Sequence, residues 1–182
     1  MAQVQVEALN RPEGSRVSYS SQEDQQFIDY AIELSRRSLA KGGTPFGAII
    51  VVNGIVVGEG QSRVVELRDP TAHAEVMALR DAGVRLERHL IEDGVMYASS
   101  EPCPLCLSAC YWARIPRLVF GATTRDVAES GFEDLQFYRQ LAVPAERRSM
   151  VEDRSDEATR LRSLDVLRSW VDALPEPVVP KL

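Results

Sequence analysis

The chain contains the stretch VMYASSEPCPLCLSACYWARIPRLVFGA at residues 95–122. Its first apolar run, residues 95–99, predicts a β-strand, and the following residues 105–113 predict a helix. A second apolar run at residues 118–122 predicts another strand. A strand, a helix and a strand in such compact spacing predict a crossover between two parallel strands. The sequence therefore predicts an α/β fold.

Upstream of this stretch, the pattern predicts a helix followed by a hairpin. Apolar residues recur at helical spacing from Glu23, and the helix is expected to end at Gly42-Gly43. Two apolar runs, residues 48–52 and 55–58, flank Asn53-Gly54, a pair favoured in type I′ turns. Both runs are almost continuously apolar, so we expect strands that are covered on both faces.

Between the hairpin and the first stretch, residues 69–71 (Asp-Pro-Thr) predict the start of a second helix, which ends near Gly83. Downstream, residues 126–130 and 135–141 predict two short helices. Residues 143–151 are ambiguous and are a candidate edge strand.

The last predicted helix, residues 155–174, has an apolar stripe and is followed by prolines. We expect a flexible arm at residues 1–21, one folded domain at 22–174 that includes this helix, and an extended tail at 175–182. The expected architecture is a three-layer α/β/α sandwich around a mixed sheet of about five strands.

Bulk composition narrows the class of protein. The 182 residues are 45% hydrophobic and 26% charged, as in ordinary globular domains. The net charge of -6 argues against general attraction to nucleic acid. No apolar run approaches the roughly 20 residues needed to cross a bilayer, and residues 1–20 lack the apolar core of an export signal. We therefore expect a cytoplasmic protein that does not bind membranes and whose main partner is not nucleic acid, although the net charge leaves a local basic patch open.

Two short motifs supply a set of metal ligands. His73-Ala74-Glu75 is followed about thirty residues later by Pro102-Cys103-Pro104-Leu105-Cys106. One imidazole and two thiolates are suitable zinc ligands, and they leave a fourth tetrahedral position open for water. The spacing H-x-E followed by P-C-x-x-C is the signature of zinc nucleobase deaminases.

The expected helix starts give these residues separate roles. We place His73 in the first turn of the second helix and Cys103 and Cys106 at the start of the third, where unpaired backbone N–H groups favour thiolate. Glu75 lies about 200° around a helix from His73, so it is poorly placed to bind the same ion. It is better placed to move a proton of a zinc-activated water.

A C-x-x-C pair alone also fits a structural zinc site or a redox pair. A closed structural site needs a fourth ligand, and only Cys110 and His89 remain as cysteine and histidine candidates. Cys110 also fits a small buried residue, and His89 lies in a charged stretch typical of a solvated loop.

The chain resembles the cytidine deaminase superfamily, and within it the bacterial guanine deaminase branch, from about Glu23 to Met150. The matching segments are PFGA (45–48), DPTAHAE (69–75), EPCPLC (101–106), YWAR (111–114) and GFED (131–134). The resemblance implies the cytidine deaminase-like fold, one zinc ion per chain and a homodimer. It also implies hydrolysis of a free nucleobase, most simply guanine to xanthine and ammonia.

The resemblance further assigns roles to individual residues. His73, Cys103 and Cys106 are the implied zinc ligands and Glu75 the catalytic carboxylate, while the implied substrate contacts are Phe46, Ser62, Ala74, Trp112 and Asp134. Asp134 matches the acid that contacts the amino edge of guanine, which is rich in hydrogen-bond donors. Alternatively, Asp134 caps the following helix, and Phe46 and Trp112 pack in the core.

One substitution sets this chain apart from the guanine pattern, because Ser62 stands where relatives usually have asparagine. A hydroxyl donates one hydrogen bond but cannot pair in a bidentate manner. Other aminated rings (cytosine, isocytosine, an aminotriazine) therefore remain alternative substrates. A tRNA adenosine deaminase shares the motif and is a further alternative, as is a zinc-stabilised binding module without activity, in which Glu75 is dispensable.

Overall fold

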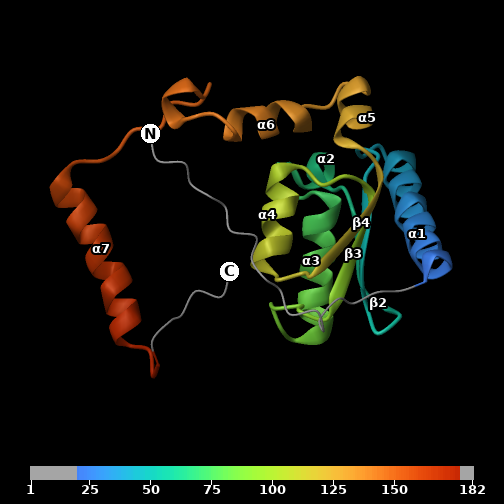
Figure 1. Cartoon of the computed structure of the whole chain (residues 1–182), viewed down its shortest axis with the longest axis horizontal. Helices are drawn as coiled ribbons and strands as arrows, with labels where there is room; N and C mark the ends of the chain where they lie inside the picture. Colours follow the sequence, from blue (N-terminus) through green and yellow to red (C-terminus); the bar gives the residue numbers. More distant parts are fainter. Residues whose placement is uncertain (1–19, 177–182) are drawn as a thin grey trace. The chain divides into compact units, whose positions relative to one another are not determined.

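The computed structural model describes residues 20–176, which form the helices and strands shown in Figure 1. Their bounds are α1 Ser21–Ala40, β1 Gly47–Val52, β2 Ile55–Gln61, α2 Val64–Leu67, α3 Ala74–Leu86, β3 Gly94–Ser100, α4 Pro104–Trp112, β4 Arg117–Ala122, α5 Thr124–Glu129, α6 Asp134–Leu141, the 3₁₀ helix η1 Ala145–Arg147 and α7 Glu157–Asp172. Within this part of the chain, no helix combines the length and apolarity required to span a membrane. The chain divides between Arg139 and Gln140 into two compact units.

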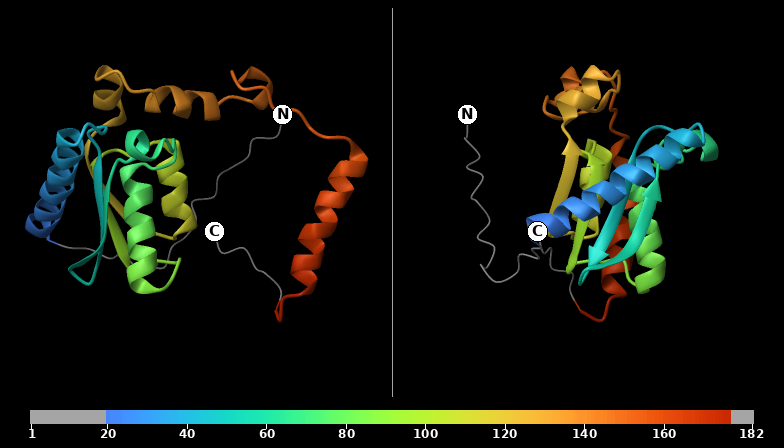
Figure 2. Two further views of the ribbon diagram at one scale, coloured as in Figure 1. Left: turned by 180° about the vertical axis from the view of Figure 1, so that it is seen from behind. Right: turned by 90° about the vertical axis from the view of Figure 1, so that its right-hand side faces the viewer.

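The first unit contains a four-stranded mixed sheet with the order β2-β1-β3-β4 (Figure 2). Strand β1 pairs in an antiparallel manner with both β2 and β3. Strands β3 and β4 run parallel, with α4 connecting them. The predicted parallel crossover is therefore confirmed.

The β1–β2 hairpin turns at Asn53-Gly54, as expected. Asn53 has φ 51° and Gly54 has φ 75°, so both residues adopt the left-handed conformation that a type I′ turn requires. Strand β1 is buried at every position, whereas β2 is an edge strand and is only partly buried. The prediction that both strands are covered was therefore right for β1 and wrong for β2.

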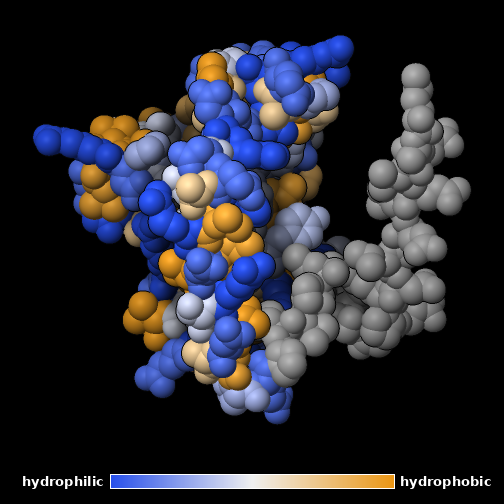
Figure 3. Space-filling view, turned by 90° about the vertical axis from the view of Figure 1, so that its left-hand side faces the viewer, coloured by the Kyte–Doolittle hydropathy of each residue, from blue (hydrophilic) through white to orange (hydrophobic). Residues whose placement is uncertain are grey.

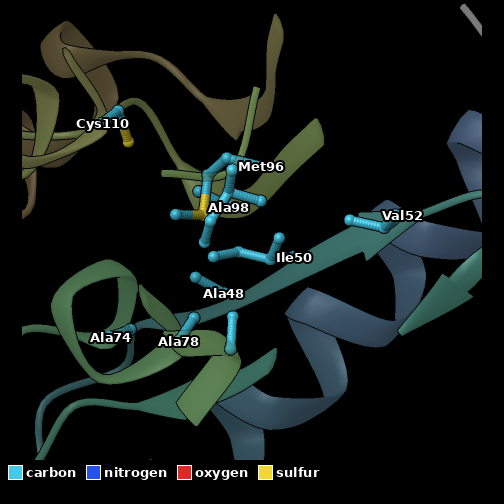
Figure 4. Packing of buried hydrophobic residues seen from close by; sticks show 10 residues of the cluster. Ala48, Ile50, Val52, Ala74, Ala78, Met96, Ala98 and Cys110 are labelled. Carbon is cyan, nitrogen blue, oxygen red and sulfur yellow. The ribbon is translucent and has the colours of Figure 1, made fainter. Parts of the chain in front are cut away.

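The core has two layers, one on each face of the sheet, because side chains alternate along β1 and β3. One layer contains Ala48, Ile50, Met96, Ala98, Cys110 and the α3 residues Ala74 and Ala78; Figure 4 shows the two α3 alanines facing Ala48 and Ile50. The other layer joins Ile49, Val51, Val95 and Tyr97 to Ile28 and Leu34 of α1. Helices α3 and α4 thus cover one face and α1 the other, which confirms the expected three layers (Figure 1).

Helix α3 approaches strand β2 very closely at Gly60. A Cβ atom at this position would lie 1.8 Å from the carbonyl oxygen of Ala74, so only glycine fits there. Because Ala74 is the first residue of α3, this contact fixes the helix start, where His73 and Glu75 lie, directly against the sheet.

Helix α3 also begins later than predicted. Residues 69–71 form a turn instead of the first helical turn, because the side chain of Asp69 accepts hydrogen bonds from the backbone N–H and the hydroxyl of Thr71 (2.8 and 2.6 Å). His73 has extended backbone angles and is the N-cap residue. The short helix α2 was not predicted.

The candidate edge strand at residues 143–151 does not form, because this segment contains the 3₁₀ helix η1 and no strand, and the sheet has four strands instead of about five. Pro144 has no N–H group to donate to a sheet. The neighbouring backbone groups pair locally: Ser149 N–H donates to the side chain of Gln140 (2.7 Å), and Arg148 Nε donates to the carbonyl of Val143 (3.2 Å).

Helix α7 belongs to the second unit and begins where Asp156 accepts a hydrogen bond from Thr159 N–H (2.7 Å). None of its 16 residues, all of them described, is buried. Its exposed apolar side chains are Leu161, Val166, Leu167, Trp170 and Val171, and Figure 3 shows apolar groups set among hydrophilic ones on the face turned to the viewer. The predicted arm and tail lie largely outside the described residues, so the predicted domain boundaries remain a prediction.

Candidate functional site

Two helix N-termini bring three potential metal ligands together. His73 is the N-cap residue of α3, and Cys103 is the N-cap residue of α4, whose first turn contains Cys106. Neither N-cap side chain forms a capping hydrogen bond with its helix. Instead, His73 Nδ1 lies 3.5 Å from Cys103 Sγ and 3.4 Å from Cys106 Sγ.

These distances fit one zinc ion. Ligands about 2.3 Å (sulfur) and 2.05 Å (nitrogen) from a tetrahedral zinc lie about 3.6 Å from each other. The three ligand atoms all lie within 4.8 Å of one another, and both cysteines are buried. The donor set and its spacing therefore match a zinc site with three protein ligands.

No fourth protein ligand joins this group within residues 20–176. Cys110 is 4% exposed and packs in the core with Ala48 and Ile50, and His89 is exposed to solvent. The alternative of a closed structural site therefore finds no support in the described part of the chain. Three protein ligands and one free position are typical of catalytic zinc.

The two thiols interact strongly. A hydrogen bond from Cys106 lowers the pKa of Cys103 to about 4, and the same bond raises the pKa of Cys106. The hydrogen bond with Cys103 also raises the pKa of His73. The pairing therefore favours the thiolate form of Cys103, and a zinc ion bound there would be held by both sulfurs as thiolates.

Glu75 lies in the first turn of α3 and is only 6% exposed. Its Oε2 accepts a hydrogen bond from Cys106 Sγ (3.3 Å). Burial raises the pKa of this carboxyl group. The structure therefore places a carboxyl of raised pKa beside the ligand group but outside it.

A cavity of about 370 Å³ opens beside the ligand group. Its lining includes His73, Glu75 and Cys103 together with four of the five predicted substrate contacts, Phe46, Ser62, Ala74 and Asp134. Trp112 is not among the lining residues and is 84% exposed. The reason is its place at the far end of α4, about 12 Å along the helix from Pro104.

One wall of the cavity is aromatic. The rings of Phe46 and Phe132 meet edge to face, with centroids 4.9 Å apart and planes at 72°. Gly131 has φ 92°, a conformation that favours glycine, and so turns the chain just before Phe132. A wall of this kind provides apolar contact for a flat ring.

Polar groups line other parts of the cavity. The hydroxyl of Ser62 accepts a hydrogen bond from the Thr44 hydroxyl (2.6 Å), which leaves its own proton to donate. Asp134 is the first residue of α6 rather than the capping residue before it, and burial raises its pKa. The cavity therefore combines a hydroxyl with an acidic side chain.

The lining residues Thr44 and Glu101, and Tyr138, which does not line the cavity, make contacts to which the sequence assigned no role. Thr44 pairs with Ser62, and Glu101 Oε2 accepts a hydrogen bond from Thr124 N–H (2.7 Å) at the start of α5. Tyr138 donates its hydroxyl proton to the carbonyl of Pro102 (2.7 Å), and burial raises the pKa of Tyr138 to about 12. These contacts join residues 18 to 36 positions apart, so no local pattern announces them.

The comparisons with known proteins agree with this geometry. A family model described as the cytidine and deoxycytidylate deaminase zinc-binding region matches residues 21–122. The guanine deaminase of Bacillus subtilis is 43% identical over 125 residues, which are 68% of this chain and 80% of that protein. A tRNA-specific adenosine deaminase of Haemophilus influenzae is 34% identical over 129 residues, 68% of this chain and 75% of that protein.

Solved structures give the same result. The X-ray structure of the Bacillus subtilis guanine deaminase superposes with a TM-score of 0.77 at 37% identity, covering 85% of this chain and 98% of that one. A guanine deaminase from Nitrosomonas europaea superposes with a TM-score of 0.58 at 31% identity, covering 64% and 66%. The chain is thus a zinc-dependent deaminase and belongs to the cytidine and deoxycytidylate deaminase family.

Proposed function

We propose that the protein hydrolyses guanine to xanthine and ammonia. The observation that supports this substrate most directly is the position of Asp134, which lines the same cavity as His73, Cys103 and Glu75. An acidic acceptor suits a ring edge that presents an amino group and a ring N–H. The similarity to guanine deaminases supports the same choice.

In this proposal, His73, Cys103 and Cys106 hold the zinc ion and Glu75 moves protons. Zinc bound there supplies Lewis-acid chemistry and lowers the pKa of water to about 7. Glu75 accepts the proton that water loses as its oxygen bonds to the amino-bearing carbon. The carboxyl gives that proton to the adjacent ring nitrogen. It then takes the remaining hydroxyl proton from the tetrahedral carbon and gives it to the amine, which leaves as ammonia when the carbon–nitrogen bond breaks.

The cavity wall orients the base for this reaction. Phe46 and Phe132 contact the ring, Asp134 accepts hydrogen bonds from the amino edge, and Ser62 donates to an acceptor on the ring. The raised pKa of Glu75 suits a group that must both accept and release protons near neutral pH.

An ammonia-release screen tests the proposal. The zinc-loaded protein is assayed with guanine, guanosine, cytosine, adenine and aminated triazines, and we expect the highest kcat/KM with guanine. No turnover of guanine combined with good turnover of another ring would overturn the substrate assignment while leaving the zinc chemistry intact.

The tRNA-specific adenosine deaminases among the relatives make tRNA the second substrate to test. The net charge of -6 disfavours it. Arg148, half of the basic pair Arg147-Arg148, is already paired with Glu152 (2.7 Å). We therefore expect no inosine in tRNA incubated with the enzyme. The homodimer implied by the resemblance remains a prediction.

A further inference from the structure

Residues 123–138 form one side of the cavity. A hydrogen bond near each end of this segment joins it to residues 101 and 102, which directly precede the proposed zinc ligand Cys103. At one end, Glu101 Oε2 accepts the N–H of Thr124 (2.7 Å). At the other, the hydroxyl of Tyr138 donates to the carbonyl oxygen of Pro102 (2.7 Å). The lining residues Gly131 to Asp134 lie between these two hydrogen bonds in the sequence.

The hydrogen bond from Tyr138 to Pro102 is well placed to fix the position of Asp134. Tyr138 follows Asp134 by four residues on α6, so both side chains project from the same face of this helix. Pro102 is fully buried and immediately precedes the ligand Cys103. A buried carbonyl needs a hydrogen-bond donor, and the Tyr138 hydroxyl supplies one across 36 residues of sequence.

We propose that Tyr138 is a positioning residue for base recognition. Its hydrogen bond holds the first turn of α6, and therefore Asp134, at a fixed place relative to Pro102 and the adjacent Cys103. This inference rests on the proposed function, in which Asp134 contacts the base. The hydroxyl acts through the backbone of Pro102 and does not itself line the cavity. Its loss should consequently weaken binding of the base more than it slows the chemical step.

The first test compares Tyr138→Phe with Tyr111→Phe. Both variants lose a phenol oxygen, but Tyr111 is 53% exposed on α4 and does not line the cavity. We expect KM of Tyr138→Phe to rise about fivefold to tenfold, as for one lost hydrogen bond with a carbonyl left unpaired. Its kcat should stay within about twofold, its zinc content should remain one per chain, and Tyr111→Phe should match the parent. An unchanged KM, or loss of zinc from Tyr138→Phe, would overturn the proposal.

A double-mutant cycle tests whether Tyr138 acts through Asp134. In the Asp134→Asn background, we expect Tyr138→Phe to change KM by less than about twofold, because the residue being positioned no longer contributes fully. An equal KM increase in both backgrounds would contradict the proposed coupling.

The cycle uses the base that the parent enzyme deaminates fastest in the screen above. Failure of guanine as a substrate is then distinct from failure of the role proposed for Tyr138. The first would show in the parent enzyme alone, and the second only in the variants.

Discussion

The zinc-binding end of the site and its base-recognition side are built in different ways. The zinc-binding end uses residues 73–75 and 103–106, which lie in two short motifs at two helix N-termini. The recognition side draws on side chains spread from Thr44 to Phe137. Reaction chemistry is therefore encoded locally in this chain, whereas substrate choice depends on long-range folding.

Residues 131–137 of the recognition side are less buried than the zinc-binding end, whereas Ser62 on the same side is as buried as Glu75. Cys106 is 0% and Glu75 6% exposed, whereas Phe137 on the recognition side is 50% exposed. Buried, mutually bonded groups tolerate little change, and half-exposed groups tolerate more. Substitutions at the zinc-binding end should therefore abolish activity, and substitutions on the recognition side should tune it.

The largest effect is expected for Cys106→Ala. Removal of one of three ligands should abolish stoichiometric zinc binding and reduce ammonia release at least about 10⁴-fold, since both water activation and proton transfer depend on the ion. Zinc per chain, measured by elemental analysis, checks the cause. Cys110→Ala is the matched control. This cysteine packs in the core and is not among the ligands, so the variant protein should keep one zinc ion per chain. Full zinc occupancy in Cys106→Ala would break the assignment of the ligands.

A smaller effect is expected for Asp134→Asn on the recognition side. Loss of the charged acceptor should raise KM for guanine about 10- to 100-fold, the range for hydrogen bonds to charged groups, with one zinc per chain retained. Steady-state ammonia release gives KM, and Glu129→Gln, an exposed acid on α5, controls for charge. If Asp134→Asn binds guanine as well as the parent does, the recognition side must use another acceptor.

The smallest effect on catalysis is expected outside both regions, at Asp24. Its carboxylate accepts two bonds from Arg117 (2.8 and 2.5 Å) and one from the Tyr97 hydroxyl (2.6 Å), which joins α1 to β3 and β4. Asp24→Asn should lower the free energy of unfolding by about 1–3 kcal/mol at pH 7, with kcat and KM nearly unchanged. Urea unfolding measures the first quantity, with Asp29→Asn as the exposed control.

The Asp24 pair also gives a pH dependence. The hydrogen bonds from Arg117 lower the pKa of Asp24 in the folded protein, so the unfolded chain binds the proton more readily. The contribution to stability is present above the unfolded pKa of about 3.9 and is lost as the pH falls through the lower folded value. In urea titrations at acidic pH, the free energy of unfolding of the parent should fall by the contribution of Asp24. The Asp24→Asn variant lacks this contribution and should not show that fall. Parallel profiles for the two proteins would contradict this account.

Much of the fold could be predicted from local patterns. The Asn53-Gly54 turn, the parallel crossover through α4 and the helices on both faces follow from residue types and spacing. The candidate edge strand at residues 143–151 was not correct, because Pro144 and local side-chain hydrogen bonds favour a 3₁₀ helix at residues 145–147. Apolar content alone does not reveal such local competition.

The site also has parts that local sequence patterns predict and parts that depend on long-range contacts. The approach of His73, Cys103 and Cys106 was predictable because both motifs begin helices on one side of a crossover. Trp112 resembles a base-lining residue in sequence, yet it lies at the exposed end of α4. The bond from Tyr138 to Pro102 was not predictable, since it depends on how α6 packs in three dimensions.

The most direct test of the central claim, that ligands and proton carrier are separate residues, is the zinc content and ammonia-release rate of Glu75→Gln. Glutamine keeps the size of the side chain but cannot carry the proton. The variant should retain one zinc per chain and lose about 10²- to 10⁴-fold in kcat. A zinc-loaded Glu75→Gln enzyme that releases ammonia at the parent rate would contradict the account.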